Sequence, residues 1–196
     1  MNKKVLTLGV GFLLLTTACD QKSETQIVDQ QRDTVTTNDD LFDNNDLERE
    51  LNLSFSSKSD SNLSGTAVFT QDGDEVTLRV DVSGLTAGGE HAIHIHEFGD
   101  CSSPDASSAG GHWNPTGDNH GEFDSDAFHL GDIGNLDADN DGNATLTFST
   151  DKWCIDCDDA DKNIIGRSLI IHQGTDDFVT QPTGDAGGRI GCLVIE

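Results

Sequence analysis

Basic residues are scarce in this chain of 196 residues. It contains 11 Lys and Arg against 36 Asp and Glu, which gives a formal net charge of −25. A protein that binds nucleic acid or an anionic membrane surface needs a basic patch, so neither is expected as a partner. The acidity also argues against bulk attraction of an anionic substrate, which would need a local positive group to guide it.

No apolar run is long enough to cross a bilayer. The run from Val5 to Leu15 follows Lys3 and Lys4 and is typical of a secretory signal. Small residues then lead to Cys19, and this pattern resembles a bacterial lipoprotein signal that is cut before the cysteine and lipidated on it. The alternative is an ordinary signal peptide with an incidental cysteine. We expect residues 1–18 to be a lipoprotein signal peptide.

The expected location is therefore the cell envelope of a bacterium, with the protein facing the periplasm or the cell surface. The lipid on Cys19 would be its only link to a membrane, and the sequence leaves open which membrane that is. Residues 19–50 contain few apolar residues and show no clear period, so they cannot bury enough surface to offset their ordering entropy. They are predicted to be a flexible linker, with a short helix possible over Leu41–Leu51, and residues 51–196 are predicted to be the folded domain.

The predicted domain lacks a long amphipathic helix. Its apolar residues instead alternate with polar ones in short segments, as in half-buried strands. These segments are residues 67–69, 76–82, 91–97, 144–148, 168–172 and 193–195. Loops rich in Gly and Asp join them, which indicates an all-β fold, either an antiparallel sandwich or a flattened barrel.

One loop has two interpretations. Asp137 to Gly142 matches the start of a calcium-binding loop, but Phe148 stands where such a loop requires a bidentate carboxylate. We therefore favour an Asp-Gly hairpin turn at this position.

Histidine is absent from most of the chain. Six of its seven histidines lie within residues 91–134, and the seventh is His172. Because neutral imidazole is a common metal ligand, this crowding indicates a metal centre. Residues two apart in a strand face the same side, so His94 and His96 can bind one ion. His91 is an odd number of positions from both and is predicted to be a packed supporting histidine.

The remaining candidate ligands lie in irregular segments or at a strand end. They are His112, His120, His129, Asp132 and His172. With His94 and His96 they make seven residues, whereas two four-coordinate metals need eight ligand positions. Seven residues suffice if one imidazole is shared through both of its ring nitrogens. Spacing alone proposes this arrangement without assigning the shared residue.

Several motifs then carry a specific resemblance. They read HAIHIHEFGDC, GGHWNP, NHG, HLGDIGN, IIGRSLIIHQGTDDF and TGDAGGRIGCLVI. Over residues 62–196 these motifs resemble the copper–zinc superoxide dismutase family, because they occur in the order of that family and at nearly its spacing. The resemblance implies an all-β fold, a Greek-key eight-stranded antiparallel flattened barrel or sandwich, immunoglobulin-like, with long metal-binding loops.

The resemblance also implies the ligands of a copper ion and a zinc ion. Copper would be bound by His94, His96, His112 and His172, and zinc by His112, His120, His129 and Asp132. His112 would then be the bridging imidazolate. Asp176 resembles the carboxylate that links a copper histidine to a zinc histidine and fixes their ring orientations.

Further roles follow from the same resemblance. Arg189 aligns with the arginine that guides superoxide and orients it by charge-assisted hydrogen bonds. Thr183 matches the residue that narrows the substrate channel on the side opposite this arginine. Cys101 and Cys192 match the disulfide of the family. The segment from His172 to Thr183 is short and lacks the lysines of animal members, which argues against strong electrostatic steering.

Cys154 and Cys157 depart from the family pattern. A CxxC pair can be a local disulfide, a redox pair or half of a metal site, and only one such pair is present. Of these alternatives we favour a local structural disulfide. The predicted secretory signal implies an oxidising compartment, in which the Cys101–Cys192 disulfide can also form.

The resemblance implies that the protein dismutates superoxide to oxygen and hydrogen peroxide, with His112 and Arg189 as catalytic residues. An alternative from another class is a non-catalytic copper-binding or copper-delivery module on the same fold, because fold does not fix function. A copper-only enzyme is disfavoured by the presence of His120, His129 and Asp132 together. Family members occur as dimers and as monomers, so a homodimer is possible.

Overall fold

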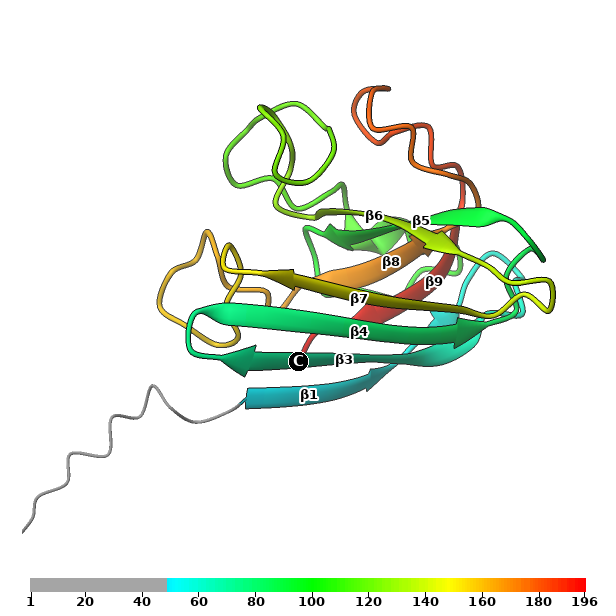
Figure 1. The fold of residues 1–196 in the computed structure, drawn as a ribbon, viewed down its shortest axis with the longest axis horizontal. Helices are drawn as coiled ribbons and strands as arrows, with labels where there is room; N and C mark the ends of the chain where they lie inside the picture. The colour runs from blue at the N-terminus through cyan, green and yellow to red at the C-terminus, as the bar shows by residue number, and fades with distance from the viewer. Residues whose placement is uncertain (1–48) are drawn as a thin grey trace, which may run out of the picture. The chain divides into compact units, whose positions relative to one another are not determined.

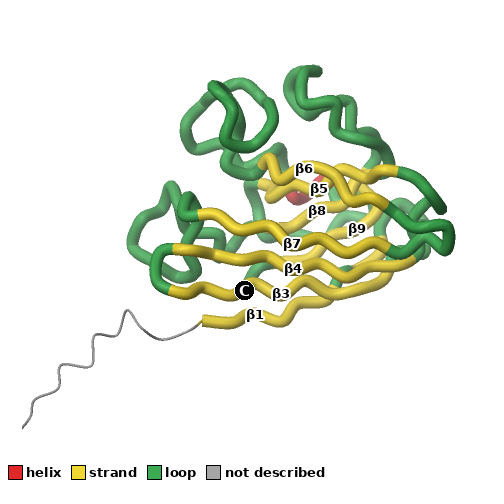
Figure 2. The backbone as a smooth tube through the Cα atoms, viewed as in Figure 1, coloured by secondary structure: helices red, strands yellow, loops and turns green. Residues whose placement is uncertain are grey.

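A computed structural model describes residues 49–196, which consist of β-strands joined by loops. The strands are β1 (Arg49–Ser54), β2 (Ser56–Ser57), β3 (Ser64–Asp72), β4 (Glu75–Ser83), β5 (Glu90–His96), β6 (Asp132–Asp137), β7 (Ala144–Thr150), β8 (Ser168–His172) and β9 (Arg189–Val194). The helical structure in this range is one 3-10 turn, Ser107–Ala109, drawn red in Figure 2. Within residues 49–196, no helix has the length and apolar character needed to cross a membrane.

The strands form two antiparallel sheets packed in layers (Figure 1). One sheet has the order β1-β3-β4-β7 and the other the order β2-β9-β8-β5-β6. β1 pairs with β3, and β2 pairs with β9, so one extended segment passes from one sheet to the other at the buried Phe55. Counted as one strand, β1 and β2 bring the total in the described residues to eight, and the predicted flattened antiparallel barrel is confirmed.

The core lies between the two sheets and follows from the period of two along each strand. β4 shows it most regularly, because its apolar residues are buried while the residues between them are exposed or half-buried. The largest core side chains include Phe69, Leu78, Ile93, Ile95, Leu136, Leu169 and Ile171. Burying each such side chain stabilises the fold by roughly 1.5–3 kcal/mol.

β5 departs from this one-sided pattern, because six of its seven residues are buried, and its neighbour β8 does so too, with all five residues buried. Ile93 and Ile95 face the core, and two long loops cover the other side. These loops are residues 97–131, between β5 and β6, and residues 173–188, between β8 and β9. Figure 1 shows both loops rising from the same side of the sheet. The covered face of β5 is therefore a buried space between strand and loops.

Three details differ from the sequence prediction. The possible helix over Leu41–Leu51 is wrong at its end, where Arg49 to Leu51 are extended in β1 and pair with β3. Asp132 begins β6 instead of lying in a loop. The turn after Asp137 is not a hairpin within one sheet, because β6 and β7 are edge strands of different sheets.

The turn is nevertheless stabilised by its own residues, since Asp139 Oδ1 accepts the backbone N–H groups of Asp141 and Asn143, at 2.8 Å each.

Four predictions lie outside the described residues. They are the signal peptide, the lipid on Cys19, the linker before Arg49 and residues 41–48 of the possible helix.

Candidate metal centre

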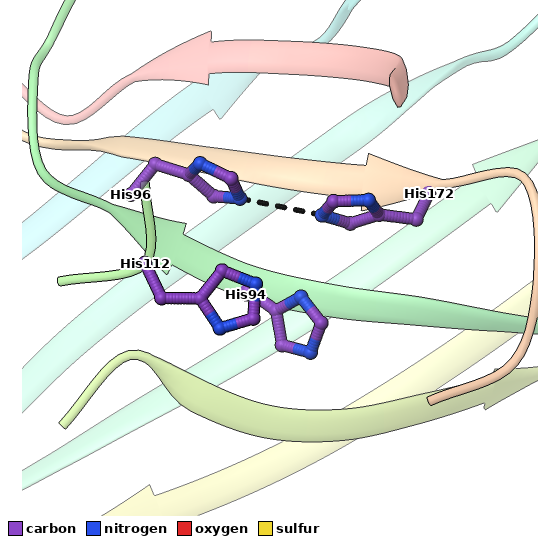
Figure 3. A group of neighbouring side chains, drawn as sticks. All are labelled: His94, His96, His112 and His172. Atoms are coloured by element: carbon purple, nitrogen blue, oxygen red, sulfur yellow. Dashed lines mark hydrogen bonds between the residues drawn. The ribbon is translucent and has the colours of Figure 1, made fainter. Parts of the chain in front are cut away.

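Four histidines converge on the covered side of β5 (Figure 3). His94 and His96 come from β5, His172 from the end of β8, and His112 from the loop after β5. One ring nitrogen from each lies within 4.8 Å of the others, and all four side chains are buried. The spacing of His94 and His96 along one strand thus places both on one face, as alternation requires.

The free nitrogens of this cluster define where an ion would bind. His96 Nε2 and His172 Nε2 lie 3.2 Å apart, while the Nδ1 atoms of these rings face the carbonyl oxygens of Gly110 and Gly187. His94 Nδ1 and His112 Nε2 are buried without any hydrogen-bond partner. Such unpaired buried nitrogens cost free energy unless a ligand satisfies them, so these rings fit a bound metal ion.

A second cluster adjoins the first and contains His112, His120, His129 and Asp132, again with ligand atoms within 4.8 Å of one another. Asp132 is its centre: His112 Nδ1 lies 2.7 Å and His129 Nδ1 3.3 Å from Oδ1, and His120 Nδ1 lies 3.0 Å from Oδ2. Ligands of a tetrahedral zinc ion are about 3.3 Å apart, so three nitrogens and one carboxylate at these distances fit zinc.

His112 belongs to both clusters. Its Nδ1 faces Asp132 in the second cluster, and its unpaired Nε2 is left for the first. The isolated antiparallel bridge between His96 and His112 fixes the backbone of this loop against the end of β5. The structure therefore places one imidazole between two candidate ion sites, as the count of ligand positions anticipates.

Asp176 joins the two clusters from the other loop. Its Oδ2 lies 2.7 Å from His94 Nε2, and its Oδ1 lies 2.9 Å from His120 Nε2. Asn135 on β6 holds the backbone of Asp176 at both its N–H and its C=O, at 2.8 and 3.0 Å. Gly184 packs against this carboxylate, and an added Cβ would lie 1.9 Å from Asp176 Oδ1, so only glycine fits there.

Burial sets the charge states of the first cluster. Desolvation lowers the pKa of His94 and brings those of His96 and His172 well below the usual value, and it lowers the pKa of His112 to about 4. These imidazoles are therefore neutral at pH 7, which is the form that binds metals. His120 differs: burial alone would lower its pKa, but Asp132 and Asp176 outweigh that effect and raise it to about 9.

The two predicted acids are held as carboxylates. Burial acts to raise the pKa of Asp132, but hydrogen bonds from three histidines hold it far below the usual range. The pKa of Asp176 is likewise lowered, against its burial, by His120 and His94. Both groups can therefore offer negative charge to cationic ligands or protonated histidines at any physiological pH.

Arg189 begins β9 and pairs in register with His172 on β8. Its Nη1 and Nη2 donate to the carbonyl oxygens of Ala106 and Gly110, each at 2.6 Å, so the loop after β5 fixes the guanidinium. Its positive charge contributes to the lowered pKa values of His96 and His172. Thr183 is half-buried in the loop that leads to β9.

His91 is absent from both clusters. It is buried, its Nδ1 donates to the carbonyl oxygen of His172 at 2.9 Å, and its Nε2 accepts the N–H of Thr86 at 3.2 Å. These two bonds require the neutral ring with its proton on Nδ1. His91 thus supports the backbone of His172 without facing the candidate ion sites.

The four cysteines of the described domain form two disulfides. Cys101 is joined to Cys192 with a Cα–Cα distance of 5.8 Å, and this bond ties the loop after β5 to β9. Cys154 is joined to Cys157 within the loop between β7 and β8, with a Cα–Cα distance of 6.0 Å. The favoured interpretation of the CxxC pair as a local disulfide therefore matches the structure.

Two residues near the second cluster were not found from the sequence. Gln181 makes a reciprocal pair with His120, accepting its N–H at 2.9 Å and donating to its C=O at 2.8 Å. Trp153 donates its indole N–H to the carbonyl oxygen of Leu130 at 2.8 Å. Neither lies in a periodic pattern or a motif, and both act across a long sequence separation.

Together, these features define a β-barrel protein with two adjoining candidate metal-ion sites that have the His112 imidazole in common. A family model described as copper/zinc superoxide dismutase (SODC) matches residues 63–195, more than half of the chain. This chain therefore belongs to the copper/zinc superoxide dismutase family, whose cofactors are copper and zinc.

Curated relatives and solved structures agree with this assignment. A superoxide dismutase (Cu-Zn) of Paramecium bursaria Chlorella virus 1 is 40% identical over 141 residues, covering 68% of this chain and 72% of the relative. One of Schizosaccharomyces pombe is 39% identical over 146 residues, covering 70% and 92%. A double mutant of a SOD-like protein from Bacillus subtilis superimposes with a TM-score of 0.65 at 30% identity, covering 73% and 96%.

Proposed function

We propose that this protein converts two superoxide radicals and two protons to one molecule of oxygen and one of hydrogen peroxide. The main support for the proposal is the position of His112. Its Nε2 belongs to the cluster with His94, His96 and His172, and its Nδ1 faces Asp132 in the second cluster. Copper in the first cluster would supply the one-electron redox couple, and zinc in the second a fixed positive charge.

The protein's own contribution at His112 is to hold a proton close to the reaction. Its Nδ1 stays in the Asp132 cluster, so the ring keeps its place whatever happens at Nε2. The Nε2 atom can therefore take up a proton and donate it again without movement of the ring. This provides one of the two protons that the reaction consumes.

Arg189 supplies the local positive charge that an anionic substrate needs in a chain of net charge −25. Two of its five N–H donors are used by backbone carbonyls, and the rest remain to bind superoxide by charge-assisted hydrogen bonds. Because the guanidinium is fixed by the same loop that carries His112, it orients the substrate relative to the histidine cluster.

The test is the rate of superoxide decay by the copper- and zinc-loaded protein and its Arg189→Ala and Arg189→Lys variants. We expect Arg189→Ala to lower the second-order rate constant by roughly 10-fold or more, because local focusing of this kind is worth 10–10³ in rate. Arg189→Lys should recover part of the rate. Arg79→Ala is the matched control, because Arg79 is exposed on β4 and the change in net charge is the same.

An equal loss in the Arg79 variant would contradict the role of Arg189. Bound metals without turnover above that of free copper would instead support the non-catalytic copper-binding module. Metal analysis of the same samples distinguishes this outcome from a failure to load.

We further propose that the protein is lipid-anchored through Cys19 in a bacterial cell envelope. The support is the sequence alone: Lys3, Lys4, a short apolar run and small residues before the cysteine. A Cys19→Ser variant should leave the membrane fraction, and mass spectrometry of the wild-type N-terminus should show the lipid. A homodimer also stays a prediction, which sedimentation of the loaded protein tests.

A further inference from the structure

Residues 151–157 follow β7 and carry the CxxC pair that departs from the family pattern. Their first large residue, Trp153, is 1% exposed and belongs to the hydrophobic core. Its ring packs against Phe148 of β7, with ring centroids 5.0 Å apart. A tryptophan buried so completely needs a partner for its indole N–H, and the position of that partner is informative.

That partner lies within the proposed zinc-binding segment. Trp153 Nε1 donates to the carbonyl oxygen of Leu130 at 2.8 Å. Leu130 directly follows His129 and stands two residues before Asp132, so the bond fixes the backbone between two candidate ligands. The bond spans 23 residues of sequence and joins two separate loops.

Trp153 touches the same segment at a second point. Its ring lies edge-on to Phe123, at a centroid distance of 6.2 Å and an interplanar angle of 79°. Phe123 lies between His120 and His129 and packs also on Phe128 and Phe148. Lys152 forms an ion pair with Asp124 at 3.2 Å, but both side chains are well exposed, so this contact contributes little.

Trp153 directly precedes the short loop that the Cys154–Cys157 disulfide closes. The N–H of Cys154 donates to Lys162 O at 2.9 Å, and its C=O accepts the N–H of Ile164 at 3.0 Å. The N–H of Ile155 donates to Gln71 Oε1 on β3 at 2.7 Å. The disulfide therefore closes a short loop whose backbone is hydrogen-bonded to residues 162–164 on one side and to β3 on the other.

We propose that Trp153 is a positioning residue for the zinc-binding segment, and that the Cys154–Cys157 disulfide holds Trp153 in place, so that zinc retention depends on both. The inference rests on the proposed zinc site. It assigns a role to the CxxC pair that differs from redox catalysis and from metal binding by the cysteines themselves.

The chain offers a matched control in its second tryptophan. Trp113 is 2% exposed and lies beside a candidate ligand, but its indole N–H has no hydrogen-bond partner among the described residues. Its ring is covered by the Arg167 guanidinium, 4.2 Å from the centroid. Trp113→Phe and Trp153→Phe therefore make the same change in volume, but only the second removes a hydrogen bond.

The experiment follows zinc release from the full, copper- and zinc-loaded protein into excess chelator. We expect Trp153→Phe to release zinc roughly 10-fold faster than the wild type, the lower end for groups that orient metal ligands, and Trp113→Phe to stay within about twofold. The Cys154→Ala, Cys157→Ala double variant should accelerate release in the same direction. Copper content should be unchanged in each case.

A second readout separates positioning from general loss of stability. With cobalt(II) in the zinc site, the visible absorption bands report the ligand geometry, and they should change in Trp153→Phe but not in Trp113→Phe. Thermal unfolding of the metal-free variants gives their loss of stability independently.

Equal zinc release and equal cobalt spectra for the two tryptophan variants would overturn the proposal while leaving the zinc site and the proposed function intact. An unchanged release rate in the double cysteine variant would overturn the role of the disulfide. A wild-type chain that holds no zinc would overturn both this inference and the two-metal site on which it rests.

Discussion

Replacing Asp176 by Asn removes the one carboxylate that joins the two clusters. Asp176 accepts from His94 Nε2 at 2.7 Å and from His120 Nε2 at 2.9 Å, and it is buried. Asparagine keeps one oxygen but turns an NH₂ group toward one of these rings, and the negative charge is lost. Groups that orient metal ligands in this way contribute 10–100-fold in affinity, which corresponds to about 1.4–2.8 kcal/mol.

The loss should fall more on zinc than on copper. His94 lies on β5, whose backbone is held by neighbouring strands on both sides, whereas His120 lies in a loop. Without the carboxylate, the loop-borne ring has fewer contacts to keep its orientation. Zinc affinity is measured by competition with a chelator of known affinity, and copper affinity is measured in the same way on the same variant.

Asp185→Asn is the control, because Asp185 is exposed in the same loop and asparagine tolerates its left-handed backbone, φ +56°. We expect its zinc affinity to match the wild type. An Asp176→Asn variant with zinc affinity within about twofold of the wild type would refute the reasoning that this carboxylate orients His120.

Three further predictions follow from the same structure. His112→Ala should weaken the binding of copper and zinc together, as metal analysis would show, and loss of one metal alone would count against the shared imidazole. Replacing Cys101 and Cys192 by alanine should lower the free energy of unfolding by about 4–5 kcal/mol in denaturant titrations, since the bond closes a loop of 91 positions; a loss below about 1 kcal/mol would contradict this. The rate of superoxide decay should rise as ionic strength increases from 0.01 to 0.15 M, because residues 173–188 contain three Asp and no Lys or Arg in a chain of charge −25, and salt screens that repulsion; a falling rate would show that attraction dominates.

The sequence predicted best those features that depend on a local period. The alternation of a strand places His94 and His96 on one face of β5 and His91 away from it, and the structure shows both arrangements. The number of candidate ligands suggested that one imidazole is shared, but only the family resemblance assigned that place to His112. The facing of the β5 histidines, by contrast, needs only the geometry of one strand.

Features that depend on distant pairing were not predictable in this way. β1 lies in a polar stretch, and its strand conformation comes from pairing with β3 and from the partial burial of Leu51 and Leu53. The turn after Asp137 has the residues of a hairpin, but local chemistry does not determine which sheet the next strand joins. Gln181 and Trp153 each act through hydrogen bonds to a distant loop and leave no pattern in the sequence.

If a single cluster of four histidines binds the copper that performs the reaction, stepwise addition of copper to the zinc-loaded protein should show it. The rate of superoxide decay should then rise linearly and break at one copper per chain, because His94, His96, His112 and His172 form one such cluster in the described residues. A break at another stoichiometry, or a rate no higher than that of free copper, would contradict it.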